Sequence, residues 1–324
     1  MAAPAVRAAV VIPNWNGAAW LTGCLDAVAA QTHPPEEVVV VDGASSDDSL
    51  TVLSQHPSAP RVVQLGANLG FGAAANRGIA ATCADAVALV NTDVVLAEDW
   101  LERALAALAS HADAAAVATK MVALDDPGRI DDTGDFLGRD GAAVQRGKFR
   151  PDHGQWDAPG EVWGACAGAA LYRRDAVLAV GGFDERFFMY LEDVDLALRL
   201  HLAGWRCRYE PAVARHAAEG SSGQLSRPPA FWVARNNLLL VAKAFPLRWA
   251  PFVLYRQAGY AWHAARQGRL RAHVRGLAAA VPLLPAMLRE RSRLRRSARV
   301  PIEEAIPARP IRGPRALGHP RSGE

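Results

Sequence analysis

Three acidic side chains lie together in an otherwise apolar stretch, "FFMYLEDVDLALRL" at residues 187–200. They are Glu192, Asp193 and Asp195. Acids are seldom buried unless they are paired or bound to a metal. They could begin a helix, because carboxylates favour the positive end of the helix dipole, and the helical apolar spacing continues as far as Gly204. They could equally line a site that uses carboxylates as proton acceptors or donors.

Two further acids close apolar runs. Asp42 follows "VVVV", where a carboxylate can accept hydrogen bonds from a nucleotide base or ribose. It could instead start an Asx-turn in the loop "GASSDDS". Asp93 follows "LVNT" and suits Mg²⁺ or Mn²⁺, which take one or two protein carboxylates together with phosphate oxygens. Its alternative is a cap for a helix near Ala97, although it lies several residues early for that role.

The elements that must position these acids alternate along the first half of the chain. Short apolar runs predict strands, and the segments between them predict helices. Strands that alternate with helices predict an α/β fold with a mostly parallel sheet covered on both faces. The predicted strands are 8–12, 37–41, 61–65 and 86–90, and the predicted helices are 18–30, 47–55, 72–82 and 97–110.

Polar residues follow all four predicted strands, in "PNWNG", "DGASSDDS", "GANLGFGAAANRG" and "NTD". Ligands of such sheets bind beyond the carboxyl ends of the strands, so the sequence predicts a polar ligand there, a nucleotide. "GFGAAA" at 70–75 formally matches a dinucleotide fingerprint, but it follows the third strand instead of the first and does not indicate a dehydrogenase.

Composition is normal for a soluble globular protein, and the charge distribution indicates an acidic body with a basic tail. Half of the residues are hydrophobic, and the four scattered cysteines suit a reducing cytoplasm; we expect no signal peptide. Residues 243–324 hold 17 Lys or Arg against 4 acids, whereas residues 1–242 hold 19 against 29. The longest apolar run of the tail, 276–288, is shorter than the roughly 20 residues that span a bilayer.

The tail therefore has three open interpretations. Residues 244–300 mix aromatic residues and arginines at helical spacing, which is typical of a basic amphipathic helix on anionic lipid. The same helices could pack on the acidic surface of the enzyme itself. Basic clusters also bind nucleic acid, a partner that we do not expect here. Residues 301–324 are rich in Pro and Arg and are expected to be disordered.

The ordered motifs resemble the inverting family-2 glycosyltransferases, and most closely their bacterial rhamnosyltransferase-like branch. The resemblance covers roughly residues 7–245. It implies a GT-A fold in residues 1–243, with a nucleotide-sugar-binding half (1–110) and an acceptor and catalytic half (111–243). The motifs that carry it are "VVIPNWNG", "VVVVDGASSDDS", "NLGFGAAANRGI", "LVNTDV", "GACAGAALYRRDAV", "GGFDERFFMYLEDVDLALRL", "GWRCRYEPAVARH" and "FWVARNNLLL".

The resemblance also implies roles for individual residues. Asp193 falls at the position of the catalytic base, and Glu192 is expected to orient substrate. Asp93 is the metal-binding acid, but Asn91 replaces the first acid of the usual D-x-D element. His216 matches a histidine that adds a metal ligand in some relatives, or it is an ordinary loop histidine. The residues expected to bind the nucleotide sugar are Pro13, Asn14, Asn16, Asp42, Asn68, Gly70, Asn76 and Asn91.

The implied activity is transfer of a hexose from a nucleotide-diphosphate sugar to a hydroxyl of a lipid-linked cell-wall or surface polysaccharide acceptor. The expected donor is dTDP-rhamnose, which would supply rhamnose, and the alternative donor is UDP-galactose or UDP-GlcNAc. The expected cofactor is Mn²⁺ or Mg²⁺, and the expected location is the inner face of the bacterial plasma membrane. A nucleotidyltransferase and an inactive sugar-binding or scaffold relative remain as rivals.

Overall fold

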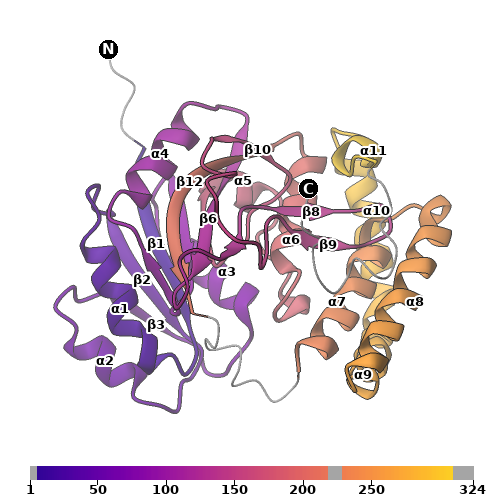
Figure 1. Ribbon diagram of the computed structural model, residues 1–324, viewed down its shortest axis with the longest axis horizontal. Coiled ribbons are helices and arrows are strands. Elements are labelled where there is room, and N and C mark those ends of the chain that lie inside the picture. Colours follow the sequence, from indigo (N-terminus) through magenta and orange to yellow (C-terminus); the bar gives the residue numbers. More distant parts are fainter. Residues whose placement is uncertain (1–5, 218–227, 309–324) are drawn as a thin grey trace.

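The computed structural model describes residues 6–217 and 228–308. A central sheet carries helices on both faces, and a group of C-terminal helices lies beside it (Figure 1). The strand order is β10-β12-β6-β11-β4-β1-β2-β3, with β5 paired to β12 and β7 paired to β6. The strands are β1 (Ala8–Asn14), β2 (Glu37–Asp42), β3 (Arg61–Gln64), β4 (Ala86–Val90), β5 (Val94–Leu96), β6 (Ala114–Ala123), β7 (Ile130–Asp132), β10 (Gly160–Val162), β11 (Ala169–Arg173) and β12 (Arg206–His216).

The first half forms the parallel part of the sheet, and the predicted α/β class is confirmed. Strands β1 to β4 pair in parallel in the order 3-2-1-4. Along β1, Val10 packs into one core and Val11 into the core on the opposite face, because successive strand residues point to opposite sides. Helices α1 (Ala18–Ala29), α2 (Ser49–Gln55) and α4 (Trp100–Ala109) cover the first face, and α3 (Phe71–Ala81) covers the second.

The second half extends the same sheet. Strand β11 lies antiparallel between β4 and β6 and so joins the two halves, whereas β12 runs parallel to β6. Helices α5 (Arg174–Ala179) and α6 (Glu192–Leu202) pack on the α3 side. A separate hairpin of β8 (Asp135–Leu137) and β9 (Ala143–Gln145) reaches from this half toward the C-terminal helices.

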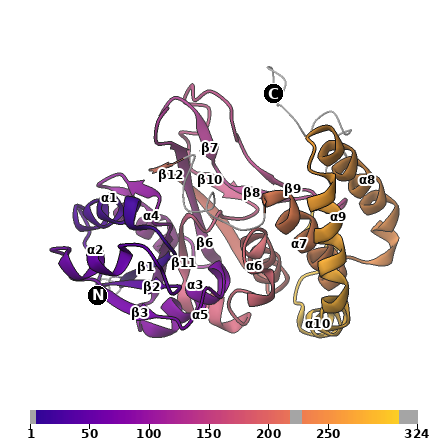
Figure 2. The same cartoon turned by 90° about the horizontal axis from the view of Figure 1, so that it is seen from below.

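The C-terminal helices share a hydrophobic core with α6. They are α7 (Pro229–Ala244), α8 (Ala250–Arg266), α9 (Leu270–Ala280), α10 (Leu284–Ser297) and α11 (Ile302–Ala305), drawn from orange to yellow in Figures 1 and 2. Val194 and Leu198 of α6 pack in one cluster with Leu240 of α7 and Met287 of α10. The predicted boundary after residue 243 falls at the end of α7. The hydrophobic core on the two sides of this boundary is continuous.

The expectation of disorder from residue 301 is wrong for its first residues. Ile302–Ala305 form α11, and Ile306 is fully buried. The Trp163 indole donates a hydrogen bond to the Ala305 carbonyl at 2.7 Å, and Arg139 donates one to the Ile306 carbonyl at 2.9 Å. These contacts supply the burial that the local sequence lacks. Residues 309–324 lie outside the described part of the chain.

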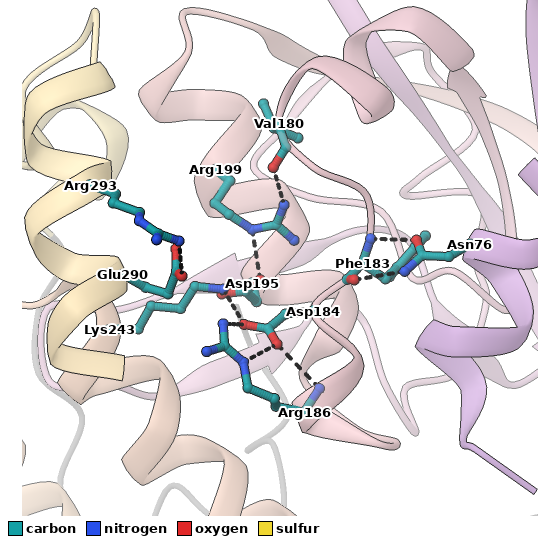
Figure 3. Close-up of polar contacts among 10 residues, drawn as sticks. All are labelled: Asn76, Val180, Phe183, Asp184, Arg186, Asp195, Arg199, Lys243, Glu290 and Arg293. Atoms are coloured by element: carbon teal, nitrogen blue, oxygen red, sulfur yellow. Dashed lines mark hydrogen bonds and ion pairs between the residues drawn. The ribbon is translucent and has the colours of Figure 1, made fainter. Parts of the chain in front are cut away.

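A buried ion-pair cluster ties α7 to α6 (Figure 3). Lys243 of α7 is 3% exposed, and its Nζ lies 2.6 Å from Asp184 Oδ2 and 2.7 Å from Asp195 Oδ1. Arg199 donates to the second oxygen of Asp195 at 2.8 Å, and Arg186 donates to both oxygens of Asp184 at 2.7 Å. Burial raises the pKa of Asp184, but the hydrogen bonds from Arg186 and Lys243 outweigh it and hold that pKa far below its usual range.

We predict that Lys243→Met lowers the free energy of unfolding by about 3 kcal/mol, because two buried carboxylates lose a shared cation. Arg186 and Arg199 remain and limit the loss. Arg293→Met is the matched control, since its ion pair with Glu290 is exposed and contributes under about 1 kcal/mol. Urea unfolding measures both variants, and an equal, small effect in the two would contradict a stabilising role for Lys243.

Candidate active site

One cleft of about 430 Å³ opens at the carboxyl ends of β1 and β4. The strand order reverses between these two strands, which is where open α/β sheets bind ligands. Its lining includes residues that follow the parallel strands and residues of the segment that leads into α6. Of the residues expected from the sequence, the cleft is lined by Pro13, Asn14, Asn68, Gly70, Asn91, Asp93, Glu192, Asp193 and His216.

Asp42 acts on the cleft through Asn14. Its carboxylate is buried and accepts hydrogen bonds from Asn14 Nδ2 at 2.7 Å and from Ser45 Oγ at 2.6 Å. The Ser45 amide also donates to Asp42, at 3.0 Å, so the carboxylate organises its own loop as the Asx-turn interpretation expected. Asn16 likewise holds this loop by accepting from the Ser46 amide at 2.8 Å. Asp42 and Asn16 thus support the cleft wall without lining it.

A turn at Gly70 lets the start of α3 approach the segment that leads into α6. Asn68 accepts a hydrogen bond from the Gly70 amide at 3.0 Å, and Gly70 adopts a φ of +89°. The Phe71 amide donates to the Phe188 carbonyl at 2.7 Å. A Cβ atom on Gly70 would lie 2.3 Å from that same carbonyl oxygen. Only a residue without a side chain permits this approach.

Asn76 lies behind the cleft instead of in it. Its side chain pairs with both backbone polar groups of Phe183: it accepts from the amide at 2.7 Å and donates to the carbonyl at 2.9 Å (Figure 3). It therefore ties α3 to the loop that precedes α6. Asn76 was expected to bind the nucleotide sugar, but it is not among the residues that line the cleft.

Asp93 and His216 meet at the other end of the cleft. Asp93 follows β4, His216 ends β12, and their Oδ1 and Nε2 atoms lie 3.5 Å apart. Asp131 accepts a hydrogen bond from His216 Nδ1 at 2.9 Å, which directs Nε2 toward Asp93. Burial raises the pKa of Asp131, but the contacts with His216 and Lys148 lower it to about 2.

This pair fits a divalent cation that has two protein ligands. Metal–oxygen and metal–nitrogen bonds of about 2.0–2.2 Å allow one ion to contact both atoms across 3.5 Å. A carboxylate that orients the far nitrogen of the ring is the usual support of a metal-binding histidine. Within residues 6–217 and 228–308 no group of three or more His, Cys, Asp or Glu side chains is arranged to hold a metal, so phosphate oxygens would complete the coordination.

The two acids at the start of α6 have different environments. Asp193 is half-buried, and its carboxylate accepts from the amides of Val194 at 2.8 Å and Ala167 at 3.4 Å. Burial raises its pKa, and these hydrogen bonds oppose the rise. Burial and the charge of Asp193 hold the pKa of Glu192 well above its usual range. Glu192 Oε2 is buried without a hydrogen-bond partner in the described part of the chain.

A third carboxyl group faces the same part of the cleft. Asp135 begins β8, lines the cleft and is buried. Burial, followed by the charges of Asp132 and Asp193, holds its pKa well above the ordinary range. The raised pKa values favour the protonated form at Glu192 and Asp135, whereas two backbone amides favour the charged form of Asp193.

Four site residues were not anticipated from the sequence: Asp131, Asp135, Lys148 and Asn236. The cluster "IDDTGD" at 130–135 held a usable signal, because three of its six residues are acids. Lys148 lines the cleft and lies 3.3 Å from Asp131 Oδ1. Asn236 is in the quoted motif "FWVARNNLLL", but nothing local revealed its partners.

Comparisons with known proteins identify the family of the chain. The model of "Glycosyl transferase family 2" matches residues 9–181, more than half of the chain. The N-acetylglucosaminyl-diphospho-decaprenol L-rhamnosyltransferase of Mycobacterium tuberculosis (strain ATCC 25618 / H37Rv) is 30% identical over 258 residues, covering 70% of this chain and 80% of that protein.

Two solved structures share the fold. GalNAc-T7, solved with UDP, GalNAc and Mn²⁺, has a TM-score of 0.62 at 11% identity; the match covers 79% of this chain and 51%, about half, of that one. Mannosyltransferase PcManGT from Pyrobaculum calidifontis, solved with GDP-Man and Mn²⁺, has a TM-score of 0.53 at 20% identity and covers 89% of this chain and 80% of that one.

The fold and the cleft define a glycosyltransferase with the GT-A fold. The chain belongs to glycosyl transferase family 2, in its rhamnosyltransferase-like branch.

We predict that Gly70→Ala destabilises the protein by about 2 kcal/mol, because the positive φ disfavours a side chain and the new Cβ would collide with backbone. Gly66→Ala in the same loop is the control, since its Cβ would have no heavy atom within 4 Å, and it should change stability by no more than about 0.5 kcal/mol. Thermal unfolding compares the two variants. An unchanged midpoint in Gly70→Ala would show that the turn relaxes freely.

Proposed function

We propose that the protein transfers a sugar from a nucleotide diphosphate to an acceptor hydroxyl with inversion at the anomeric carbon. The observation that carries this proposal is Asp193, a half-buried carboxylate with a raised pKa that lines the same cleft as Asn14 and Asp93. A donor bound against Asn14 and Asp93 would leave Asp193 on the acceptor side.

In the proposed reaction Asp193 takes the proton from the acceptor hydroxyl. The acceptor oxygen forms a bond to the anomeric carbon, and the bond from that carbon to the phosphate oxygen breaks. The nucleoside diphosphate leaves with the bonding electron pair. Attack from the face opposite the leaving group inverts the configuration. A positioned base of this kind contributes about 10²- to 10⁴-fold.

The remaining residues bind, orient and neutralise. Asp93 and His216 would hold a divalent metal, which offsets negative charge on the departing diphosphate. An imidazole ligand favours Mn²⁺ over Mg²⁺. Lys148 adds a positive side chain to the same cleft. Burial and the charge of Asp193 raise the pKa of Glu192 and so favour its protonated form, which can donate a hydrogen bond to a sugar hydroxyl.

We propose rhamnose from dTDP-rhamnose as the transferred sugar and a lipid-linked saccharide as the acceptor, in cell-wall or surface polysaccharide synthesis. The 30% identical relative, whose name gives a rhamnosyl transfer to N-acetylglucosaminyl-diphospho-decaprenol, supports this choice. A UDP-hexose such as UDP-galactose or UDP-GlcNAc is the second candidate, because TarS of S. aureus, with a TM-score of 0.54 at 16% identity, was solved with UDP.

We predict that Asp193→Asn lowers turnover by about 10²- to 10⁴-fold and changes the donor dissociation constant by less than about threefold, because it removes the base and keeps its shape. In the wild-type enzyme turnover should rise with pH through a pKa above the ordinary aspartate value of about 3.9, since the deprotonated form is active and burial raises its pKa. Unchanged turnover in Asp193→Asn would reject this base.

A separate binding measurement, by calorimetry, identifies the donor. The folded protein is titrated with dTDP-rhamnose, UDP-galactose and UDP-GlcNAc, with and without Mn²⁺. Asp93→Asn serves as the matched variant and should lose only the metal-dependent part of binding. A donor that binds equally well with and without Mn²⁺ would argue against the metal role of Asp93, and no binding of any donor would favour a scaffold protein.

We also propose that the C-terminal helices rest on anionic lipid at the cytoplasmic face of a bacterial plasma membrane. Leu247, Phe252, Leu254, Tyr255 and Trp262 form an exposed apolar surface on and before α8, which we call the α8 surface. No acid occurs between Ala244 and Arg289, a stretch that holds seven arginines. In the described part of the chain no helix is long and apolar enough to span a bilayer.

We predict that the protein floats with vesicles of phosphatidylglycerol and phosphatidylcholine but not with phosphatidylcholine alone. The double variant Tyr255→Ser, Trp262→Ser should bind the anionic vesicles at least about tenfold less, because it removes apolar area from the α8 surface. Leu178→Ser is the control, since Leu178 of α5 is 43% exposed and Trp262 is 45% exposed. Equal loss in both, or equal binding to neutral vesicles, would reject a docking role.

A further inference from the structure

The segment from Phe187 to Leu191, which leads into the base, has an unusual backbone. Phe188, Tyr190 and Leu191 have φ values of 65°, 65° and 67°. Residues other than glycine seldom adopt this region of backbone conformation. Leu191 caps α6 in this left-handed conformation, and the helix begins at Glu192. The path of this segment therefore decides where the Asp193 carboxylate lies.

Asn236 of α7 makes most of the side-chain hydrogen bonds that hold this path in the described part of the chain. Asn236 of α7 is fully buried, and its Nδ2 donates to the carbonyls of Phe187 at 2.8 Å, Met189 at 2.7 Å and Tyr190 at 2.7 Å. An amide nitrogen carries only two protons, so the three carbonyls share them. The three oxygens can converge on one nitrogen only because the backbone turns through its left-handed residues.

Arg235 strengthens this contact. Its Nη1 donates to Asn236 Oδ1 at 2.6 Å, and a cation on the amide oxygen polarises the amide toward better donation. The Arg235 guanidinium also lies 5.5 Å from the centre of the Trp232 ring, and Trp232 stacks on Phe188 at 4.7 Å. Helix α7 thus contacts the segment in two ways, by hydrogen bonds to its carbonyl groups and by stacking of Trp232 on Phe188.

We propose that Asn236 is the positioning residue of the catalytic base. This inference rests on the proposed role of Asp193. Asn236 touches neither donor nor acceptor and acts by holding residues 187–191 in the one path that aims Asp193 into the cleft. The segment also meets the donor wall, through the hydrogen bond from Phe71 to the Phe188 carbonyl, so its position relates the base to the donor.

Asn237 provides an internal comparison. It is equally buried and follows Asn236 on α7, but it donates to the Gly141 carbonyl at 2.6 Å and accepts from Gln257 at 2.5 Å. It therefore secures the turn between β8 and β9 and has no hydrogen bond to the segment 187–191 among those described. A purely structural asparagine on this helix should behave like Asn237.

The test compares Asn236→Ala with Asn237→Ala in the full chain, with dTDP-rhamnose and a prenyl-diphospho-GlcNAc acceptor, or the donor that the titration identifies. Both variants should lower the unfolding midpoint by similar amounts. Asn236→Ala should lose about 10²-fold in kcat, the usual effect of a misplacement of about 1 Å, with donor KM within about threefold. Asn237→Ala should keep kcat within about threefold.

The pH profile separates positioning from general loosening. Release of the segment exposes Asp193 to water, so the acidic limb of kcat should move to lower pH in Asn236→Ala and stay in place in Asn237→Ala. If Asn236→Ala does not fold, Arg235→Met gives the same comparison, because Arg235 is only partly buried. We expect this variant to lose about tenfold in kcat and to move the acidic limb of kcat to lower pH.

Equal losses of kcat in the two alanine variants, or an acidic limb that does not move in Asn236→Ala, would overturn the positioning role. If Asp193→Asn retains turnover, the proposed base is wrong. If Asp193→Asn is inactive and Asn236→Ala behaves like Asn237→Ala, the base stands and only the positioning role fails.

Discussion

The buried ion pair between Asp195 and Lys243 is the contact on which the orientation of the start of α6, and with it of Asp193, depends. Asp195 is buried at the start of α6, and Lys243 and Arg199 compensate its charge. Residues two positions apart on a helix point about 200° away from each other. The pairing of Asp195 toward α7 therefore turns Asp193 toward the cleft. Asp195 thus joins α6 to α7, and Asp193 remains in the lining of the cleft.

The same division of roles explains how several carboxylates coexist in one cleft. Asp93 and Asp131 share His216, whereas burial and neighbouring carboxylates raise the pKa values of Glu192 and Asp135. Asp193 lies between these extremes because two backbone amides stabilise its charge. Environment, more than residue type, distinguishes the proposed metal-binding end of the cleft from the end at which we propose that Asp193 accepts a proton.

Helix α7 links catalysis to the C-terminal part of the chain. Its residues contact the loop before α6 through Asn236, the β8–β9 turn through Asn237 and the ion-pair cluster through Lys243. Its apolar face packs in one core with α8 and α10. The basic C-terminal helices are therefore a structural support of the active site, whether or not their outer surface also meets lipid.

The sequence by itself determined the fold class, because apolar strand runs alternating with helices leave few arrangements, and it placed polar residues at the strand ends where the cleft forms. It also marked Asp193 and Asp93, since both belong to ordered motifs. Tertiary structure alone decided that Asp42, Asn16 and Asn76 support the cleft from behind, and that Asp131 and Asn236 belong to the site. Hydrogen bonds such as that of Asn236 to Tyr190 join residues 46 positions apart. Local propensity and spacing contain no record of such contacts, because only the packed chain brings those groups together.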